Sequence, residues 1–477
     1  MAIALVLAPL LFASIAFAVP SGRWRPWLLP VGAAVHLGLT CVAVQGGEVV
    51  ALDGWLRIDP LSRLLLPLLS LLFFVCSLYA PGYLALRPER KNRVFCSALF
   101  AFLAMMTLIT LSHHLGLMWV ALEANTLASA PLLYFNHNAR SVEATWKYLL
   151  IGAVGIALAL LGSFFLAYAA LVPGLETSLL FEDLVRQAPL LSRPWLRAAF
   201  VLLFVGYGTK MGLAPMHTWK PDAYGEAPGL VGALLAGGLT TCAFLALLRF
   251  YQVCSAAGEA QFARELMVAM GIVSMAVAAV FMARQRDFKR MLAYSSVEHM
   301  GILVLGIGIG GAATFGALFH VVNNALAKGI LFLSAANIHR AFGSKTTDVV
   351  AGALRRVPVS GALFLAGFFA VTGSPPFAPF LSEFTILRAT IEAGRYGVAA
   401  AFLVLLFAVF VGMGATVLAV VQGEPSPDTR ETGFHDRVGT VAPILVLLAL
   451  VTLLGVYVPS GMGAALWDAA RFVEARP

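Results

Sequence analysis

Charged residues are scarce in this sequence of 477 residues, where they make up 12% against 60% for hydrophobic residues. A soluble domain has roughly 25% charged and 45–50% apolar residues, so this balance excludes a water-soluble globular protein. The apolar residues form runs along the whole chain, and several, such as 61–80 and 148–171, reach the roughly 20 residues that a membrane helix needs. The sequence therefore predicts an all-α integral membrane protein that contacts the lipid bilayer.

Cysteine is also scarce, and none of the five cysteines has C-x-x-C spacing. All of them (Cys41, Cys76, Cys96, Cys242 and Cys254) lie in or beside apolar runs, which supports no zinc site, iron–sulfur cluster or disulfide framework. The chain also lacks any block of five or more like charges despite its net charge of +8, which argues against a nucleic-acid partner. Because no nucleophile or nucleotide motif is present either, an autonomous membrane enzyme is the weakest functional hypothesis.

The positive charges that are present gather in alternate loops, at residues 23–25, 87–93, 284–290 and 340–356. The intervening loops are poorer in Lys and Arg. This positive-inside pattern is typical of a multi-pass protein, and it predicts that these loops face the cytoplasm. We therefore expect the protein in the inner (plasma) membrane of the cell.

Hydropathy predicts about fourteen transmembrane helices. They are expected at residues 2–19, 27–45, 60–80, 93–112, 115–135, 147–171, 197–219, 228–251, 263–283, 291–312, 315–337, 358–394, 397–421 and 439–459. Glycine and proline interrupt two of these spans, at 206–215 and at 372–379. Broken helices at corresponding places in two halves of a chain indicate a transport site near the middle of the membrane.

An internal repeat relates the two broken helices. Short segments at 122–123, 144–150 and 212–216 resemble, in the same order, 297–298, 325–331 and 373–377. We interpret them as two units of five helices, which are inverted relative to each other because each unit has an odd number of helices. The predicted organisation places helices 1–3 in residues 1–92, the first repeat in 93–251, the second repeat in 263–421, and the last helix with a short tail in 439–477.

Several ionisable side chains lie inside the apolar spans, where each costs roughly 2.5–3.5 kcal/mol on insertion scales and is a functional candidate. Glu123 lies near the middle of its span, and Lys210 lies within the first broken helix. The alternatives are a carboxylate that fixes helix packing and a lysine that caps carbonyls freed by the break. Glu383 follows the second break, where a carboxylate near the headgroups is the alternative. Lys147 begins its helix. A lysine at the membrane interface whose side chain extends to water explains this position equally well as a functional lysine does.

A polar stripe marks the helix expected at 315–337. His320, Asn324 and Lys328 are spaced by four residues, so they share one helical face. A hydrated pathway explains such a stripe in an apolar helix better than core packing does. Further candidates are His217, Glu298, His299, Thr241 and Asn324. A purely structural hydrogen bond is the alternative for His217 and for one of the adjacent Glu298 and His299, which face different directions.

Alternating carboxylates, lysines and histidines on successive helices have a physical use. Burial lowers the pKa of a lysine by up to about 3–5 units, and a nearby carboxylate raises it again. Moving the carboxylate toward or away from the lysine therefore protonates or deprotonates it. One pKa unit corresponds to about 1.4 kcal/mol, and moving a proton across 100 mV takes about 2.3 kcal/mol. A modest rearrangement of ion pairs therefore matches the work of proton pumping.

The segments around these residues are similar to a known family. WVALEANTLAS (119–129), GYGTKMGLAPMHTW (206–219), PDA (221–223) and HVVNNALAK (320–328) resemble the antiporter-like membrane subunits of complex I, of group 4 nickel–iron hydrogenases and of Mrp-type cation/proton antiporters. The resemblance covers nearly all of the chain. The stretches 143–148, 155–162 and 296–299 resemble most the F subunit of hydrogenase-4.

The resemblance implies a fourteen-helix core with inverted repeats and a proton pathway along the middle of the membrane. It implies that Glu123 pairs with Lys147, that Lys210 belongs to the first half-channel, and that Glu383 exchanges protons with the outside. The residues that would transfer protons are Glu123, Lys147, Lys210, His320, Lys328 and Glu383.

The sequence departs from this family at two places. Thr240 and Thr241 stand where some relatives have a lysine or histidine in helix 8, so transfer between Lys210 and His320 would depend more on water. Lys220 stands where the family usually has an apolar residue, and the sequence explains neither its presence nor its role.

The leading hypothesis is a proton-translocating subunit of a respiratory or hydrogenase complex, of the hydrogenase-4/formate hydrogenlyase or complex I type, that couples redox energy from partner subunits to proton transfer. The chain itself would be non-catalytic and hold no cofactor or metal. Iron–sulfur clusters and a nickel–iron centre or flavin would belong to partners, which are other membrane subunits and a peripheral redox arm. The alternative is a subunit of a multisubunit monovalent cation/proton antiporter or another ion-coupled transporter module.

Overall fold

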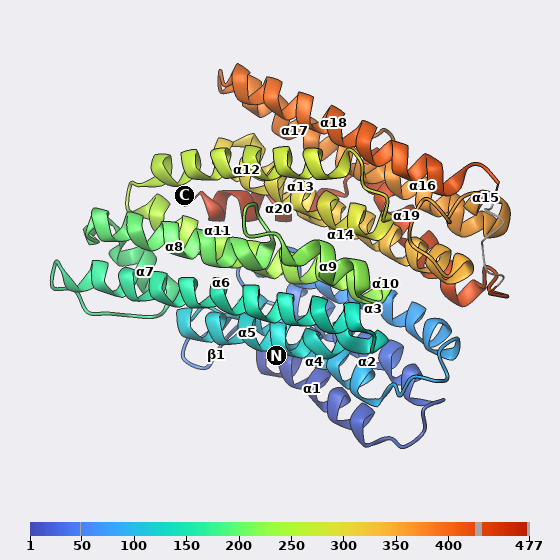
Figure 1. Ribbon diagram of the computed structural model, residues 1–477. Helices are drawn as coiled ribbons and strands as arrows, with labels where there is room; N and C mark the ends of the chain where they lie inside the picture. The colour runs from blue at the N-terminus through green and yellow to red at the C-terminus, as the bar shows by residue number, and fades with distance from the viewer. Residues whose placement is uncertain (48, 425–431, 475–477) are drawn as a thin grey trace.

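Long helices make up most of the computed structural model, which describes residues 1–47, 49–424 and 432–474 (Figure 1). A two-stranded antiparallel ribbon, β1 (Val50–Ala51) with β2 (Leu56–Arg57), lies between α2 and α3. The first helices are α1 (Ala2–Ala18), α2 (Leu28–Gln45), α3 (Pro60–Ala85), α4 (Arg93–Leu111), α5 (Leu115–Leu133) and α6 (Ala139–Leu171).

The rest of the chain is helical as well. The middle helices are α7 (Phe181–Gln187), α8 (Arg193–Met211), α9 (Trp219–Glu226), α10 (Gly229–Leu234), α11 (Thr240–Ala256), α12 (Ala260–Met282), α13 (Phe288–Ile309) and α14 (Ala312–Phe342). The last helices are α15 (Ala353–Arg356), α16 (Pro358–Val371), α17 (Ala378–Glu392), α18 (Tyr396–Val421), α19 (Val438–Val456) and α20 (Ser460–Val473). Short 3₁₀ turns lie at Arg25–Trp27, Tyr134–Asn136 and Ala188–Leu190, and a π-helical turn at Leu235–Leu239 joins α10 to α11.

The long helices lie roughly along one direction and follow one another across the molecule, from the blue helices α1–α4 to the orange helices α16–α18 (Figure 1). Helix α14 lies in the interior, where it packs against α10, α13, α16, α17 and α19. The most apolar stretch of 18 residues in α14 is completely buried. Outer helices such as α6 and α18 instead expose Phe164 and Phe407. An apolar outer surface of this kind suits contact with lipid, while a helix that is apolar on all sides belongs in the core.

Ten helical segments in the described part of the chain are long and apolar enough to cross a membrane. They match the expected helices except those at 2–19, 115–135, 197–219 and 358–394. Two apolar helices, α1 and α16, are shorter, with 17 and 14 residues. The prediction of a helical multi-pass membrane protein is confirmed, while the count of fourteen spans and the inverted repeats stay predictions.

Both expected helix breaks are present. Helix α8 ends at Met211 and is followed by Gly212, which has a φ of 78°, before α9 begins at Trp219. Helix α16 is followed by Gly373, with a φ of 64°, before α17 begins at Ala378. Glycine suits these left-handed conformations because it has no β-carbon. The breaks therefore place short non-helical segments beside the interior helices.

Small residues bring α8 against α6. A β-carbon on Gly206 would overlap Ala159 and the backbone of Gly155, and one on Gly162 would overlap Leu203. Such close backbone approach is the usual packing of small residues in membrane helices. This packing fixes the end of α8, which carries Lys210, between α6 and α5.

Candidate functional site

Lys210 and Glu123 form an ion pair between α8 and α5, in which the lysine is buried and the glutamate is partly buried. Lys210 Nζ donates to Glu123 Oε2 at 2.9 Å and to Thr126 Oγ1 at 2.6 Å. The lysine side chain is 2% exposed and the glutamate 25%. Gly152 on α6 completes the site, because a β-carbon at that position would crowd the Lys210 ammonium. The structure therefore brings together two of the predicted residues as one charge-assisted hydrogen-bonded pair.

The expected pair of Glu123 with Lys147 is wrong. Helix α6 faces Lys210 at Gly152, and Lys147 lies five residues before that point. The side chain of Lys147 contacts α9 and not Glu123. There Lys147 Nζ lies 2.8 Å from Asp222 Oδ2 and 2.6 Å from Glu143 Oε1, and it is 44% exposed. The participation of Lys147 in proton transfer stays a prediction.

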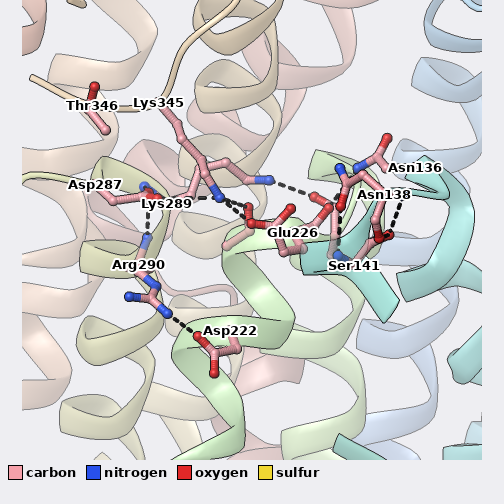
Figure 2. A network of polar contacts seen from close by, with 12 residues as sticks. Asn136, Asn138, Ser141, Asp222, Glu226, Asp287, Lys289, Arg290, Lys345 and Thr346 are labelled. Atoms are coloured by element: carbon pink, nitrogen blue, oxygen red, sulfur yellow. Dashed lines mark hydrogen bonds and ion pairs between the residues drawn. The ribbon is translucent and has the colours of Figure 1, made fainter. Parts of the chain in front are cut away.

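Asp222 belongs to a polar network at one end of the helices (Figure 2). Arg290 on α13 contacts the second oxygen of Asp222, and Lys345 pairs with Glu226 at 2.6 Å and with Asp287 at 3.3 Å. Burial raises the pKa of Asp222, but hydrogen bonds and charge interactions with Lys147 and Arg290 lower it more, so that the net pKa lies below the usual value. This network ties α9 to α13 and to the segment after α14.

Lys328 lies in a second buried group, between α14 and α13. Its Nζ donates to Ser295 Oγ at 2.6 Å, and both residues are inaccessible to solvent. Glu298 lies one turn further along α13 and is also buried. The lysine is therefore held by a hydroxyl, with a carboxylate on the same face of α13.

A hydrogen-bonded chain of histidines continues from α13 to the second helix break. His299 Nδ1 lies 2.8 Å from His320 Nε2, and His320 Nδ1 lies 2.9 Å from Ser382 Oγ on α17. The neutral imidazole has one donor and one acceptor nitrogen, so a hydrogen-bonded chain of this kind is chemically able to relay a proton by exchange of tautomers. Glu383, next to Ser382, is 7% exposed and lies against Gly373 of the break.

His299, His320 and Glu383 also form the group of described residues whose donor atoms lie within 4.8 Å of one another, as a metal ion would require. His299 Nε2 and Glu383 Oε1 are buried without a hydrogen-bond partner. Imidazole nitrogens and a carboxylate oxygen are suitable ligands for a divalent transition metal. The prediction that the chain holds no metal or cofactor stays a prediction.

The remaining candidates differ in their surroundings. Thr241 Oγ1 donates to Gly237 O of its own helix at 2.7 Å. His217 is 7% exposed, with Nδ1 buried and without a partner, and its ring lies 6.3 Å from that of Tyr294. Asn324 is buried with Oδ1 unpaired. The proton-transfer roles predicted for these residues are not tested by these contacts.

Lys220, for which the sequence predicts no role, is as deeply buried as Lys328. Its side chain is 0% exposed, and Nζ lies 3.0 Å from Ser296 Oγ. The ring of Tyr224 lies 5.8 Å from Nζ. The signal in the sequence is the lysine itself, which stands between Trp219 and Pro221 directly after an apolar span.

A second ionic group, Arg249 with Asp59 and His113, was also missed. Arg249 Nη1 lies 2.7 Å from Asp59 Oδ2, and His113 Nε2 lies 3.0 Å from the same oxygen. Burial raises the pKa of Asp59, but Arg249 and His113 together hold it well below its usual value. Burial and Arg249 lower the pKa of His113. The sequence signal is Arg249 itself, a guanidinium within an apolar run.

Comparison with known proteins agrees with this arrangement. The family described as "NADH:quinone oxidoreductase/Mrp antiporter, TM" matches residues 112–412. A hydrogenase-4 component F homolog from Methylacidiphilum infernorum (isolate V4) is 34% identical over 415 residues, which cover 84% of this chain and 85% of that protein. NADH-quinone oxidoreductase subunit N from Desulforudis audaxviator (strain MP104C) is 32% identical over 417 residues, which cover 84% of this chain and 82% of that protein.

Among solved structures, a chain of the membrane-bound sulfane sulfur reductase, an archaeal respiratory membrane complex, has the same fold. The TM-score is 0.88 at 19% identity, over 99% of this chain and 97% of the other. The resemblance predicted from the sequence, including that to the F subunit of hydrogenase-4, is confirmed. The chain therefore belongs to the NADH:quinone oxidoreductase/Mrp antiporter family of antiporter-like membrane subunits.

Proposed function

We propose that this chain translocates protons within a respiratory or hydrogenase complex, of the hydrogenase-4/formate hydrogenlyase or complex I type. The observation that carries the proposal is the presence of two ionisable groups in the helical interior, Glu123 with Lys210, and Lys328 with Ser295 and the buried Glu298 on the same helix. The family membership and the names of the relatives support it. Buried ionisable residues of this kind are the usual components of proton relays in membrane proteins.

The ion pair provides a means of coupling. While Glu123 remains 2.9 Å from Lys210, the carboxylate compensates the buried ammonium. Removing one partner of a buried pair leaves an uncompensated charge, which costs about 3–5 kcal/mol. A displacement of Glu123 therefore makes Lys210 release its proton. In the second half, Lys328, the histidine chain and Glu383 would carry the proton onward to the outside.

The complex would consist of other membrane subunits and a peripheral redox arm, in which iron–sulfur clusters and a nickel–iron centre or flavin carry the electrons. The chain itself would bind no redox cofactor and catalyse no electron transfer. It would lie in the inner (plasma) membrane. The bacterial relatives named as subunits of hydrogenase-4 and of NADH-quinone oxidoreductase support the membrane partners and the location in the membrane.

We further propose fourteen spans arranged as two inverted five-helix repeats, at residues 93–251 and 263–421. Helix packing supports this proposal. The pairs α4–α5, α5–α6 and α6–α8 in the first unit have counterparts in α12–α13, α13–α14 and α14–α16 in the second. Each unit also contains one broken helix, α8–α9 and α16–α17.

Purification of the native complex in mild detergent, followed by mass spectrometry of the subunits, tests the assignment. We expect hydrogenase-like or quinone-reductase subunits to be recovered with this chain, and their absence would contradict the proposal. The purified complex is then reconstituted in proteoliposomes, and proton uptake is measured with a pH-sensitive dye during oxidation of its donor. Transport that follows sodium instead of pH would favour a cation/proton antiporter.

A further inference from the structure

Lys220 is a buried lysine without an ionic partner. Within the described residues it forms no ion pair, and its one side-chain hydrogen-bonding neighbour is Ser296, at 3.0 Å from Oγ and 3.5 Å from O. By contrast, Lys210 has Glu123, and the buried Arg249 has Asp59. A buried charge without a counter-charge is costly and is retained mainly where it has a function.

The surroundings of Lys220 accommodate this side chain specifically. A β-carbon on Gly212 would overlap its terminal methylenes, so the break after α8 leaves the space that Lys220 fills. The Tyr224 ring lies 5.8 Å from Nζ, within the range of a weak cation–π interaction. The lysine is therefore seated between the end of α8, which carries Lys210, and the middle of α13.

Helix α13 connects Lys220 with the second buried group. Ser296 faces Lys220 on α9, whereas the adjacent Ser295 faces Lys328 on α14. Successive residues of an α-helix point about 100° apart, so neighbouring serines can serve two different helices. His299 follows Ser296 by three residues, on the same side of α13, and its Nδ1 reaches His320.

Helix α11 offers no titratable replacement at the corresponding level. The hydroxyls of Thr240 and Thr241 donate to the carbonyls of Ala236 and Gly237 in their own helix, each at 2.7 Å. Both hydroxyl hydrogens are therefore already used in hydrogen bonds to the backbone around the π-helical turn. Lys220, in contrast, is a titratable group that lies against Gly212 at the end of α8 and against Ser296 of α13.

We infer that Lys220 is a proton-transfer residue that links the Glu123–Lys210 pair to Ser296 and, one turn further along α13, to the hydrogen-bonded His299 and His320. This inference rests on the proposed function and adds the connection between its two halves. In each cycle the Lys220 ammonium gives one proton to the Ser296 side and its amine takes one proton from the Lys210 side. The charge of Lys220 is therefore the same after each transfer.

Two variants of the assembled complex test this role. Lys220→Met keeps the length of the side chain without a titratable group, and Lys220→Arg keeps the positive charge on a guanidinium that does not deprotonate in proteins. We expect both to lower dye-detected proton uptake per electron pair at least about tenfold in proteoliposomes. A role in packing or charge balance predicts instead that Lys220→Arg restores uptake.

Lys289→Met is the matched control, because Lys289 is also buried and has one hydrogen bond, 2.6 Å to Ala227 O, but lies in the network of Figure 2. We expect it to retain proton uptake. Subunit composition and the thermal unfolding temperature of each complex are measured in parallel. Lys220→Met should unfold at the same temperature as the unmodified complex or higher, since it removes an unpaired buried charge; a lower temperature would assign a structural role and overturn the inference.

Lys210→Ala separates this inference from the proposed function. If Lys210→Ala abolishes uptake while Lys220→Met or Lys220→Arg retains it, the inference is wrong and the proposed function stands. If the variants at both lysines pump at the unmodified rate, the proposed function itself fails. Loss of uptake at both positions, with Lys289→Met active, is the result we expect.

Discussion

At the residue scale, the ionisable side chains divide according to what compensates them. Lys210 has a carboxylate, Lys328 has a hydroxyl with a carboxylate nearby, and Lys220 has a hydroxyl. Lys147 is half exposed and shares Asp222 with Arg290. The buried groups form the proposed pathway, whereas the exposed pairs hold the ends of the helices together.

Glu123→Gln is expected to reduce proton uptake at least about tenfold without preventing assembly. The amide keeps the shape of the side chain and a hydrogen bond to Lys210, but it supplies no negative charge to compensate the ammonium. Glu143→Gln is the control, because its pair with Lys147 is exposed and such pairs contribute about 0–1 kcal/mol. Equal uptake in both variants, measured in proteoliposomes, would make Glu123 a packing residue.

The depressed pKa of Asp222 predicts an acid-dependent contribution to stability. Its ionised form is preferred in the folded state, so the contribution is fully present above the ordinary pKa of 3.8 and is lost as pH falls through the lower folded pKa. Asp222→Asn should therefore lower the unfolding temperature in detergent near pH 6, and the difference from the unmodified chain should shrink toward pH 3. A difference that does not change with pH would contradict an ionic contribution.

At the scale of the helix, the sequence predicted most of the long apolar elements and both breaks. Periodic apolar runs and Gly-Pro segments are local signals, which is why 206–215 and 372–379 could be recognised. The pairing of Glu123 could not be predicted this way, because it depends on the rotation of α6 and on its contact with α8. Burial of Lys220 likewise follows from a tertiary contact with α13, which no spacing in the chain reveals.

The contact of α8 with α6 is predicted to depend on Gly206. Gly206→Ala places a β-carbon against Ala159 and the Gly155 carbonyl, and overpacking of this kind costs about 1–3 kcal/mol. The expected result is a lower unfolding temperature together with reduced proton uptake, since α8 carries Lys210. Gly38→Ala on α2 is the control, because nothing lies within 4 Å of the added carbon, and it should leave both quantities unchanged.

At the scale of the whole molecule, two ionic groups join elements that are distant in the chain. The network in Figure 2 links α9 and α13 with the segment after α14. The Asp59–Arg249–His113 group links α3, α11 and the turn before α5, and it lines a cavity of about 780 Å³ together with residues of α20 such as Asp468. Among the described residues, the contacts of Lys210, Lys220 and Lys328 involve no residue of either group, so both groups join helices through interactions that the proposed transfer between these lysines does not use.

Arg249→Leu is expected to destabilise the protein by about 3–5 kcal/mol, because it leaves the buried Asp59 carboxylate without its guanidinium. The double variant Asp59→Asn with Arg249→Leu removes that uncompensated charge and should be the more stable of the two. Unfolding in mild detergent measures both, with Arg388→Leu as the control, since its pair with Glu392 is exposed and contributes little. Equal losses in the single and double variants would attribute the effect to the packing of Arg249 and not to its charge.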